Sequence, residues 1–340
     1  MKYEKRLLSA AVAAAFATGL GLHLAQAVAA ELEVKEQLGE KIFFDKNLSL
    51  LRNQACATCH VPEAGWVGDD TKINEGGGVY EGSIPGEFGN RNPPSSAYAT
   101  PSPVFWLNDE GLFEGGNFWD GRATGWELGD PSAEQARGPF LNPVEQALPD
   151  KACVVYRVCE GKYGALFDEV WGPGACAIDW PGNGVVNQQC VKSDGAVPLS
   201  DAARDKVDDA YDNIALSISA FEDSPASNAY SSKLDAVRAG LATFTEQEAL
   251  GRDIFRGKGM CSACHVGSPA GNADPPLFTD FTFDNLGVPR NPQNPASIAD
   301  PTWRDPGLGG FLATLPDYVE TDYPADNLGK HKVPTLRNVG

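Results

Sequence analysis

The sequence predicts a mainly α-helical protein built from two similar halves with long loops. Two observations support this: an amphipathic pattern followed by a short cysteine motif occurs twice, about 200 residues apart, and glycine and proline are abundant. The 340 residues include 37 glycines and 25 prolines, which favours loop-rich packing over long regular elements. At about 150 residues per domain, this length fits one large domain or two medium ones.

Each half is expected to contain an amphipathic helix ahead of its cysteine motif. Apolar residues recur on one helical face in both: Leu38, Ile42 and Phe43 in the first half, and Leu250, Ile254 and Phe255 in the second. Thr245 and Glu248 fit a capping box at the start of the second helix.

A further helix is expected over residues 205–222, where apolar residues recur at helical spacing. The Ser-Pro-Ala-Ser-Asn stretch that follows is typical of a boundary, so we predict domains over residues 31–225 and 226–340. Residues 61–118 and 266–310 are rich in glycine, proline and asparagine, and neither segment has a convincing strand pattern.

Residues 1–30 have the pattern of a secretory signal peptide. Lys2, Lys5 and Arg6 precede an apolar run that ends near Leu24, and two small-residue cleavage patterns follow. A membrane anchor is the weaker alternative, because this run is only marginally long enough and is interrupted by glycine and His23. We expect an exported protein, and the sequence beyond this segment has no other candidate for a membrane span.

The net charge limits the classes of partner. Asp and Glu number 46 against 27 Lys and Arg, which gives a formal charge of -19. So acidic a surface repels nucleic acid and anionic membranes, and it favours a cationic protein partner.

Four cysteines lie together after the first motif. In an exported chain Cys153, Cys159, Cys176 and Cys190 are expected to form two disulfides, and the sequence leaves all three pairings open. A metal site is the weaker alternative, because no histidine accompanies these four and their spacing fits no zinc pattern.

The two cysteine motifs carry the chemistry. They read Cys-Ala-Thr-Cys-His at 56–60 and Cys-Ser-Ala-Cys-His at 261–265, and Cys-x-x-Cys-His is the attachment motif of c-type haem. A zinc ribbon would need its cysteine pairs about 15 to 20 residues apart. We therefore predict two covalent haems, each bound by two thioethers and a proximal histidine: Cys56, Cys59 and His60, and Cys261, Cys264 and His265.

The sixth iron ligand decides what each haem does, because a haem with two strong ligands only moves electrons, whereas an open one binds peroxide or oxygen. Between Val61 and His265 the sequence has no histidine and only Met260 as a methionine, which adjoins the second motif. An open first haem is therefore expected, with an unusual tyrosine or a residue from elsewhere as the alternative. For the second haem the candidates are His331, Tyr318, Tyr323 or a residue beyond Gly340, although His331 reads better as a surface histidine.

Five further motifs surround these sites in a definite order. They are Arg-Asn-Pro-Pro at 91–94, Asn-Phe-Trp-Asp-Gly-Arg-Ala at 117–123, Glu-Gln-Ala at 134–136, Gly-Pro-Phe-Leu-Asn-Pro-Val-Glu at 138–145 and Lys-Val-Pro-Thr-Leu-Arg-Asn-Val at 332–339. From about residue 31 to the end, the chain resembles the bacterial di-haem cytochrome c peroxidase and MauG superfamily. The resemblance implies two cytochrome c-like domains, each a few helices around a covalent haem.

The resemblance also implies roles for individual residues. The His60 haem would be the peroxidatic centre and the His265 haem the electron-transferring one. Glu145 would be the distal acid and base that moves a proton between the peroxide oxygens, Gln135 its hydrogen-bonding partner, and Pro139 a cover over the open face.

Trp119 would lie between the two haems and pass electrons. Asn92 and the backbone carbonyls of Lys332 and Pro334 would form a calcium site at the domain junction, since oxygen ligands suit this cation. Each residue has an ordinary alternative: Glu145 as a solvated carboxylate in a turn, and Trp119 as a core aromatic.

The expected function is reduction of hydrogen peroxide to water in the periplasm, with electrons from a small cytochrome c or a cupredoxin. One alternative is a MauG-like enzyme that oxidises residues of a partner protein through a ferryl haem, and another is a non-catalytic di-haem electron carrier. A homodimer is common in the superfamily.

The sequence departs from the superfamily pattern in four respects. No distal histidine follows the first motif, about six extra residues including Trp126 separate Trp119 from Gln135, and the cysteine-bearing segment at 153–190 is unusual. The chain also stops at Gly340, so we expect that it is incomplete at its C-terminus.

Overall fold

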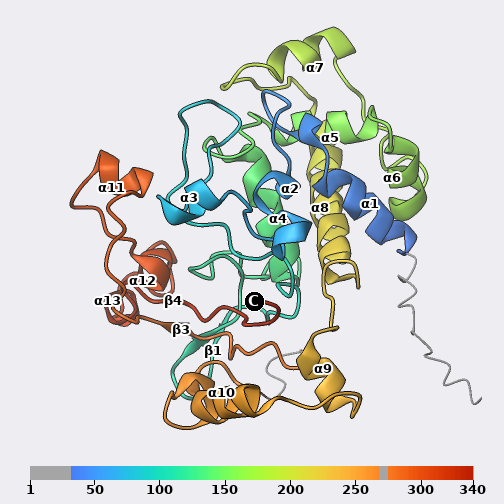
Figure 1. Ribbon diagram of the computed structural model, residues 1–340. Coiled ribbons are helices and arrows are strands. Elements are labelled where there is room, and N and C mark those ends of the chain that lie inside the picture. The colour runs from blue at the N-terminus through green and yellow to red at the C-terminus, as the bar shows by residue number, and fades with distance from the viewer. Residues whose placement is uncertain (1–31, 268–274, 340) are drawn as a thin grey trace, which may run out of the picture.

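The computed structural model describes residues 32–267 and 275–339, so the expected signal peptide at 1–30 lies outside the described residues. The described part is mainly helical, as predicted, and the cytochrome c-like character of its two halves stays a prediction (Figure 1). The α-helices are α1 (Val34–Phe43), α2 (Cys56–Cys59), α3 (Thr71–Glu75), α4 (Pro131–Leu141), α5 (Lys151–Cys159), α6 (Gly164–Trp171), α7 (Asn183–Gln189), α8 (Asp201–Asp223), α9 (Lys233–Arg238), α10 (Glu246–Arg256), α11 (Pro295–Ala299), α12 (Gly307–Leu312) and α13 (Tyr323–Asp326).

Helix α8 is the long central helix of the N-terminal part, and α1, α4 and α5 pack against it (Figure 1). The predicted helix over 205–222 is confirmed, with a start at Asp201. The apolar residues that follow one another every three or four positions are buried: Val207, Tyr211, Ile214, Ile218 and Phe221. This face therefore forms the centre of the main hydrophobic core.

A glycine allows α1 to approach α8 closely. A Cβ atom at Gly39 would lie 1.9 Å from the backbone oxygen of Ser217 and 2.8 Å from the Cβ of Phe221. No side chain larger than hydrogen fits at this contact unless the two helices separate. Leu38 and Ile42, on either side, are fully buried in the same core.

The second amphipathic helix is confirmed as α10. Thr245 and Glu248 form the predicted capping box: the Thr245 hydroxyl accepts from the Glu248 amide, and the Glu248 carboxylate accepts from the Thr245 amide. Unlike α1, this helix has no buried residue in the described structure, and Leu250 is 60% exposed.

In the described residues, four short strands form two antiparallel pairs. β1 (Trp106–Leu107) pairs antiparallel with β2 (Phe113–Glu114), and β3 (Phe283–Asp284) pairs antiparallel with β4 (His331–Lys332). Three of them fall in the segments where the sequence indicated no strand. A two-residue strand is too short for an alternating pattern to appear, which explains the difference.

A second apolar cluster crosses the predicted domain boundary at residue 225. Phe105, which precedes β1, and Phe113 of β2 pack with Phe283, Leu308 and Leu312 from the C-terminal part. The two parts are thus joined by a shared core, and the boundary itself stays a prediction. In the residues that the structure covers, no helix has the length and apolar character needed to cross a membrane.

The cysteine-bearing segment forms two disulfides, which confirms the prediction and settles the pairing. Cys153 bonds to Cys190 and Cys159 to Cys176. Cys153 and Cys159 both belong to α5, so the two disulfides attach the following segment, 160–190, to this helix. Helix α5 itself lies in the core, where Val154 and Val155 are fully buried.

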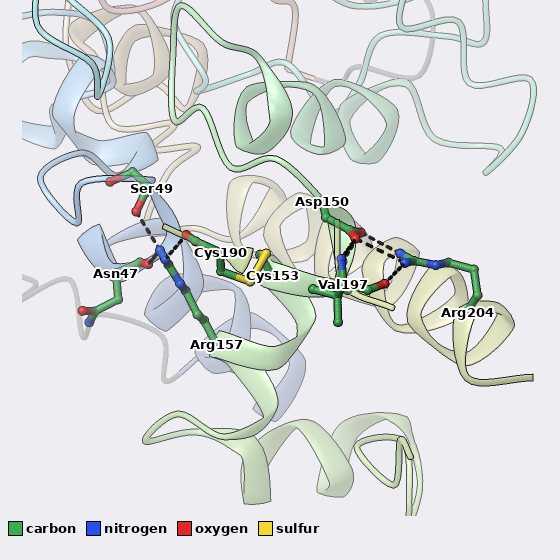
Figure 2. Close-up of a disulfide and its surroundings, with 9 residues drawn as sticks. Asn47, Ser49, Asp150, Cys153, Arg157, Cys190, Val197 and Arg204 are labelled. Carbon is green, nitrogen blue, oxygen red and sulfur yellow. Dashed lines mark hydrogen bonds and ion pairs between the residues drawn. A yellow bond between two sulfur atoms is a disulfide. The ribbon is translucent and has the colours of Figure 1, made fainter. Parts of the chain in front are cut away.

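Beside the first disulfide, a buried arginine binds three backbone carbonyls (Figure 2). Nη1 of Arg157 donates to the oxygens of Asn47 and Ser49 at 2.5 and 2.7 Å, and Nη2 donates to that of Cys190 at 3.0 Å. Burial lowers the pKa of Arg157 to about 10. The guanidinium thus ties the disulfide to the segment that leads into the first haem motif.

We expect Arg157→Met to destabilise the fold by about 2 to 4 kcal/mol, because three buried carbonyls lose a charged donor. Urea unfolding of the oxidised protein measures this change. Lys192→Met, on an exposed residue of the same segment, is the matched control and should change the free energy of unfolding by less than about 0.5 kcal/mol. Equal effects of the two substitutions would contradict this role of Arg157.

Candidate active site

A cavity of about 1030 Å³ lies between α2, α4 and the chain segment at 332–339. This volume is at the upper end of the range of cofactor sites. The structure brings to its wall most of the residues that the sequence singled out: Cys56, Cys59, His60, Asn92, Trp119, Gln135, Pro139, Glu145, Lys332 and Pro334. Cys261, Cys264 and His265 are not among its lining residues.

The orientation of His60 suits an iron ligand. Its Nδ1 lies 3.2 Å from the carbonyl oxygen of Trp66, so that nitrogen carries the proton and Nε2 keeps its lone pair. Burial lowers the pKa of His60, which favours the neutral imidazole that a metal requires.

His265 is held in the same way. Its Nδ1 lies 2.8 Å from the carbonyl oxygen of Phe278. Both acceptor residues have left-handed backbones, with φ of 65° at Trp66 and 58° at Phe278. Sequence reasoning missed these two acceptors, because a positive φ at an aromatic residue is uncommon and leaves no motif.

The four motif cysteines are all free thiols, as covalent haem attachment requires. Burial raises the pKa of the Cys59 thiol to about 12, and it raises that of Cys56 as well. The Cys264 thiol donates to Asp284 at 3.1 Å, and this hydrogen bond raises its pKa to about 11. The two motifs therefore fit the group that their sequence predicts.

Helix α4 presents two predicted distal residues to the cavity. Gln135 and Pro139 are four positions apart, so they share one face of the helix. Asp130 caps the start of α4 by accepting from the amides of Ser132 and Ala133, and Asn142 ends it. The cap at one end and the turn at the other fix where this face points.

Glu145 lies in the turn directly after α4. Its Oε1 accepts from Nδ2 of Asn142 at 2.9 Å, and its backbone oxygen accepts from the amide of Ser83 at 2.6 Å. A Cβ at Gly82 would lie 2.4 Å from the Val144 oxygen, so this loop packs tightly against the turn. Burial raises the pKa of Glu145, while Arg122 and Asn142 oppose the increase. The carboxyl is thus held in place, with a pKa above its ordinary value.

Trp119 connects the two sequence segments of the predicted calcium site. Its Nε1 donates to the backbone oxygen of Asn92 at 2.8 Å. Its own backbone oxygen accepts from the Lys332 amide, also at 2.8 Å. Nδ2 of Asn92 donates to the Gly78 oxygen, so its side-chain oxygen is the atom left for a cation. Neutral oxygen donors suit a hard cation, and calcium here stays a prediction.

The side chain of Lys332, whose backbone carbonyl belongs to the predicted calcium site, places a buried amino group among uncharged partners. Its ammonium donates to Ser102, Asn117 and the Gly116 oxygen, all uncharged acceptors. Burial lowers its pKa to about 7.

The residues considered for the second haem have other contacts. Nδ1 of His331 lies 3.1 Å from the Gly329 oxygen and its Nε2 lies 3.4 Å from Asp305, which favours the reading of His331 as an ordinary polar residue. Tyr318 and Tyr323 both pack edge-on against Phe113.

An ion-pair cluster joins the two parts beside the cavity. Arg91, in the cavity wall, donates to both carboxylate oxygens of Asp305 at 2.7 Å and to Asp120 at 2.6 Å. The Arg91 guanidinium holds the pKa of Asp305 well below its usual range. Sequence reasoning missed Asp305, because it lies more than 200 residues from Arg91.

These residues define a family as well as a site. The family model of the di-haem cytochrome c peroxidases matches residues 33–243. The chain therefore belongs to this family of oxidoreductases, and the resemblance seen in the sequence is confirmed.

Individual relatives support this membership. Methylamine utilization protein MauG of Paracoccus denitrificans is 33% identical over 303 residues, 89% of this chain and 67% of that protein. Cytochrome-c peroxidase IdrP1 of Denitromonas iodatirespirans is 25% identical over 320 residues, 90% of this chain and 66% of IdrP1. The crystal structure of the diheme peroxidase BthA from Burkholderia thailandensis matches with a TM-score of 0.71 and 29% identity, over 91% of this chain and 67% of BthA. The chain spans about two thirds of the length of these proteins.

We expect Asp305→Asn to reduce the free energy of unfolding at pH 7 by about 1 to 2 kcal/mol, because Arg91 loses a bidentate partner. Because the pKa of Asp305 is lowered by folding, its contribution is present above about pH 4 and disappears as the pH falls further. Urea unfolding at several pH values should therefore show that the two proteins converge in acid. Asp317→Asn, at an exposed position, is the control, and a constant difference at all pH values would contradict this account.

Proposed function

We propose that the protein is a periplasmic di-haem c-type peroxidase that reduces hydrogen peroxide to water. The observation that carries this proposal is that one cavity combines the first haem motif with Glu145, Gln135 and Pro139. A non-catalytic electron carrier has no need of a buried carboxyl group and an amide beside its haem.

The residues of the cavity have distinct tasks. A bound haem would supply an iron that binds peroxide and exchanges electrons. His60, oriented by the Trp66 carbonyl, would be the ligand of that iron. Glu145 accepts a proton from one peroxide oxygen and returns it to the other, and Asn142 keeps the carboxyl in position for both steps.

The lining of the cavity supports an open face of the first haem, although it includes Tyr80 and Tyr98. Among its described lining residues, His60 is the single histidine and there is no methionine. Gln135 donates or accepts a hydrogen bond at the peroxide, and Pro139 restricts the access of water. This arrangement supports a first haem whose outer face is free for substrate.

The second haem motif and Trp119 would supply electrons to the first haem. A second covalent haem on His265, in a second cytochrome c-like domain, would receive electrons, and Trp119 would pass them on. The formal charge of -19 favours a cationic donor such as a small cytochrome c, and a cupredoxin is the other class. Calcium bound by Asn92, Lys332 and Pro334 would stabilise the junction between the two domains. We also propose that the protein forms a homodimer.

A second candidate function is oxidation of residues in a partner protein. Two observations favour it: the 33% identity to a MauG protein and the lack of a distal histidine after the first motif. Steady-state turnover of peroxide with a reduced cytochrome supports the first function. Peroxide-dependent modification of a partner, with slow cytochrome oxidation, supports the second.

We expect Cys261→Ala/Cys264→Ala to reduce the haem content from two per chain to one. Intact mass and the pyridine haemochrome spectrum measure the content directly. Cys56→Ala/Cys59→Ala should remove the other haem and also abolish peroxide turnover. Two haems retained in either variant would contradict covalent attachment at these motifs.

We expect Glu145→Gln to lower kcat/KM for peroxide by about 100-fold to 10,000-fold, because the amide cannot carry the proton. The absorption spectrum of the resting protein should stay unchanged, which separates lost chemistry from lost haem. Glu160→Gln, at an exposed position, is the matched control. Full activity of Glu145→Gln would refute the assigned role.

A further inference from the structure

A second buried carboxyl group lies in the wall of the haem cavity. Glu222, the penultimate residue of α8, is 3% exposed and lines the cavity together with Glu145. Its Oε2 accepts from the Ser132 hydroxyl at 2.8 Å. The mechanism proposed above gives this residue no task.

The charged and titratable groups that face Glu222 are acidic or neutral. Helix α4 contributes Asp130, which accepts from the Ser219 hydroxyl at 2.6 Å, and α2 contributes the thiol of Cys56. Helix α1 contributes no titratable group there, but only the aromatic ring of Phe43, which lies at a tilted angle to that of Phe221. Within the described ranges, no ion pair or hydrogen bond joins Glu222 to a lysine or arginine.

Such surroundings disfavour the carboxylate. Burial and the nearby Asp130 raise the pKa of Glu222 to about 8, and the hydrogen bond from Ser132 opposes the increase only in part. Burial therefore favours the neutral carboxyl, whereas a positive charge nearby favours the carboxylate, so a change of one charge in the cavity can alter the protonation of Glu222.

The shared cavity connects this proton to the haem. Under the proposed function, the Cys56 thiol would carry the porphyrin, and both Cys56 and Glu222 line the cavity that would hold it. Oxidation of the iron adds one positive charge to the haem, and in a water-poor cavity this charge stabilises a carboxylate strongly. Reduction removes that stabilisation.

We propose that Glu222 is a redox-linked proton-binding site of the His60 haem, and this inference rests on the proposed function. When an electron from a one-electron donor reaches that haem, Glu222 takes one proton from a hydronium ion of the solvent: an O–H bond forms at the carboxylate, and one O–H bond of the hydronium ion breaks to leave water. When the electron leaves again, the Glu222 O–H bond breaks and the proton passes to a solvent water molecule.

This site has a use in the reaction. Reduction of one peroxide to two waters consumes two electrons and two protons. A proton that enters the cavity with an electron is already inside when Glu145 needs one, so the electron and the proton arrive together.

The test is the midpoint potential of the His60 haem as a function of pH, between about pH 6 and about pH 10. In the wild-type protein the potential should fall as the pH rises, by up to about 59 mV for each tenfold change in proton concentration, the value for one proton per electron. Glu222→Gln should remove this slope. Asp223→Asn, on the neighbouring exposed residue, is the matched control and should keep it.

A second variant retains the carboxyl group and so tests the site if Glu222→Gln does not fold. Ser132→Ala removes the hydrogen bond that favours the carboxylate, so the sloping region should move to higher pH. An unchanged region would overturn the proposal.

The other carboxyl in the cavity must be separated from Glu222. Glu145→Gln should leave the slope in place, and a slope that disappears in Glu145→Gln but persists in Glu222→Gln overturns the inference. The mass of the peptide that contains Cys56 is measured in each sample. A peptide without haem means that the proposed function fails, whereas an attached haem with equal slopes in wild type and Glu222→Gln means that only the present inference fails.

Discussion

The contact between α1 and α8 at Gly39 is the constraint on which the haem cavity depends. With no side chain at Gly39, the α8 backbone at Ser217 lies directly against α1. The turn of chain after α1 leads to the first haem motif, and the end of α8 supplies Ile218 and Glu222 to the cavity wall. The close contact of the two helices thus helps to place the first motif and the end of α8 around one cavity.

A second level of support comes from buried polar groups that bind backbone carbonyls. Arg157 holds the segment before the motif, and the imidazoles of His60 and His265 each face a carbonyl of an aromatic residue. These contacts do not add much apolar burial. They fix orientation, which a metal ligand needs more than it needs packing.

The sequence predicted those features that depend on local pattern. The helix over 205–222, the capping box at Thr245, the two disulfides and the joint position of Glu145, Gln135 and Pro139 were all accessible from residue types and spacing or from the family resemblance. It did not predict the strands, which are two residues long, or Asp305, which meets Arg91 only in three dimensions. It also did not predict Glu222, because a glutamate near the end of an amphipathic helix is normally solvated, and only tertiary packing buries it.

The pairing of the disulfides imposes a demand on how the protein matures. Under the proposed function, four cysteines of the chain are oxidised, at 153, 159, 176 and 190, while the four free thiols of the two motifs must stay reduced until they bind haem. An oxidant that joined Cys56 to Cys59 would block haem attachment at the first motif. Burial raises the pKa of these two thiols, which suppresses the thiolate that thiol–disulfide exchange requires. Folding around α8 therefore favours the reduced state of the first motif, whereas Cys261 of the second motif is exposed.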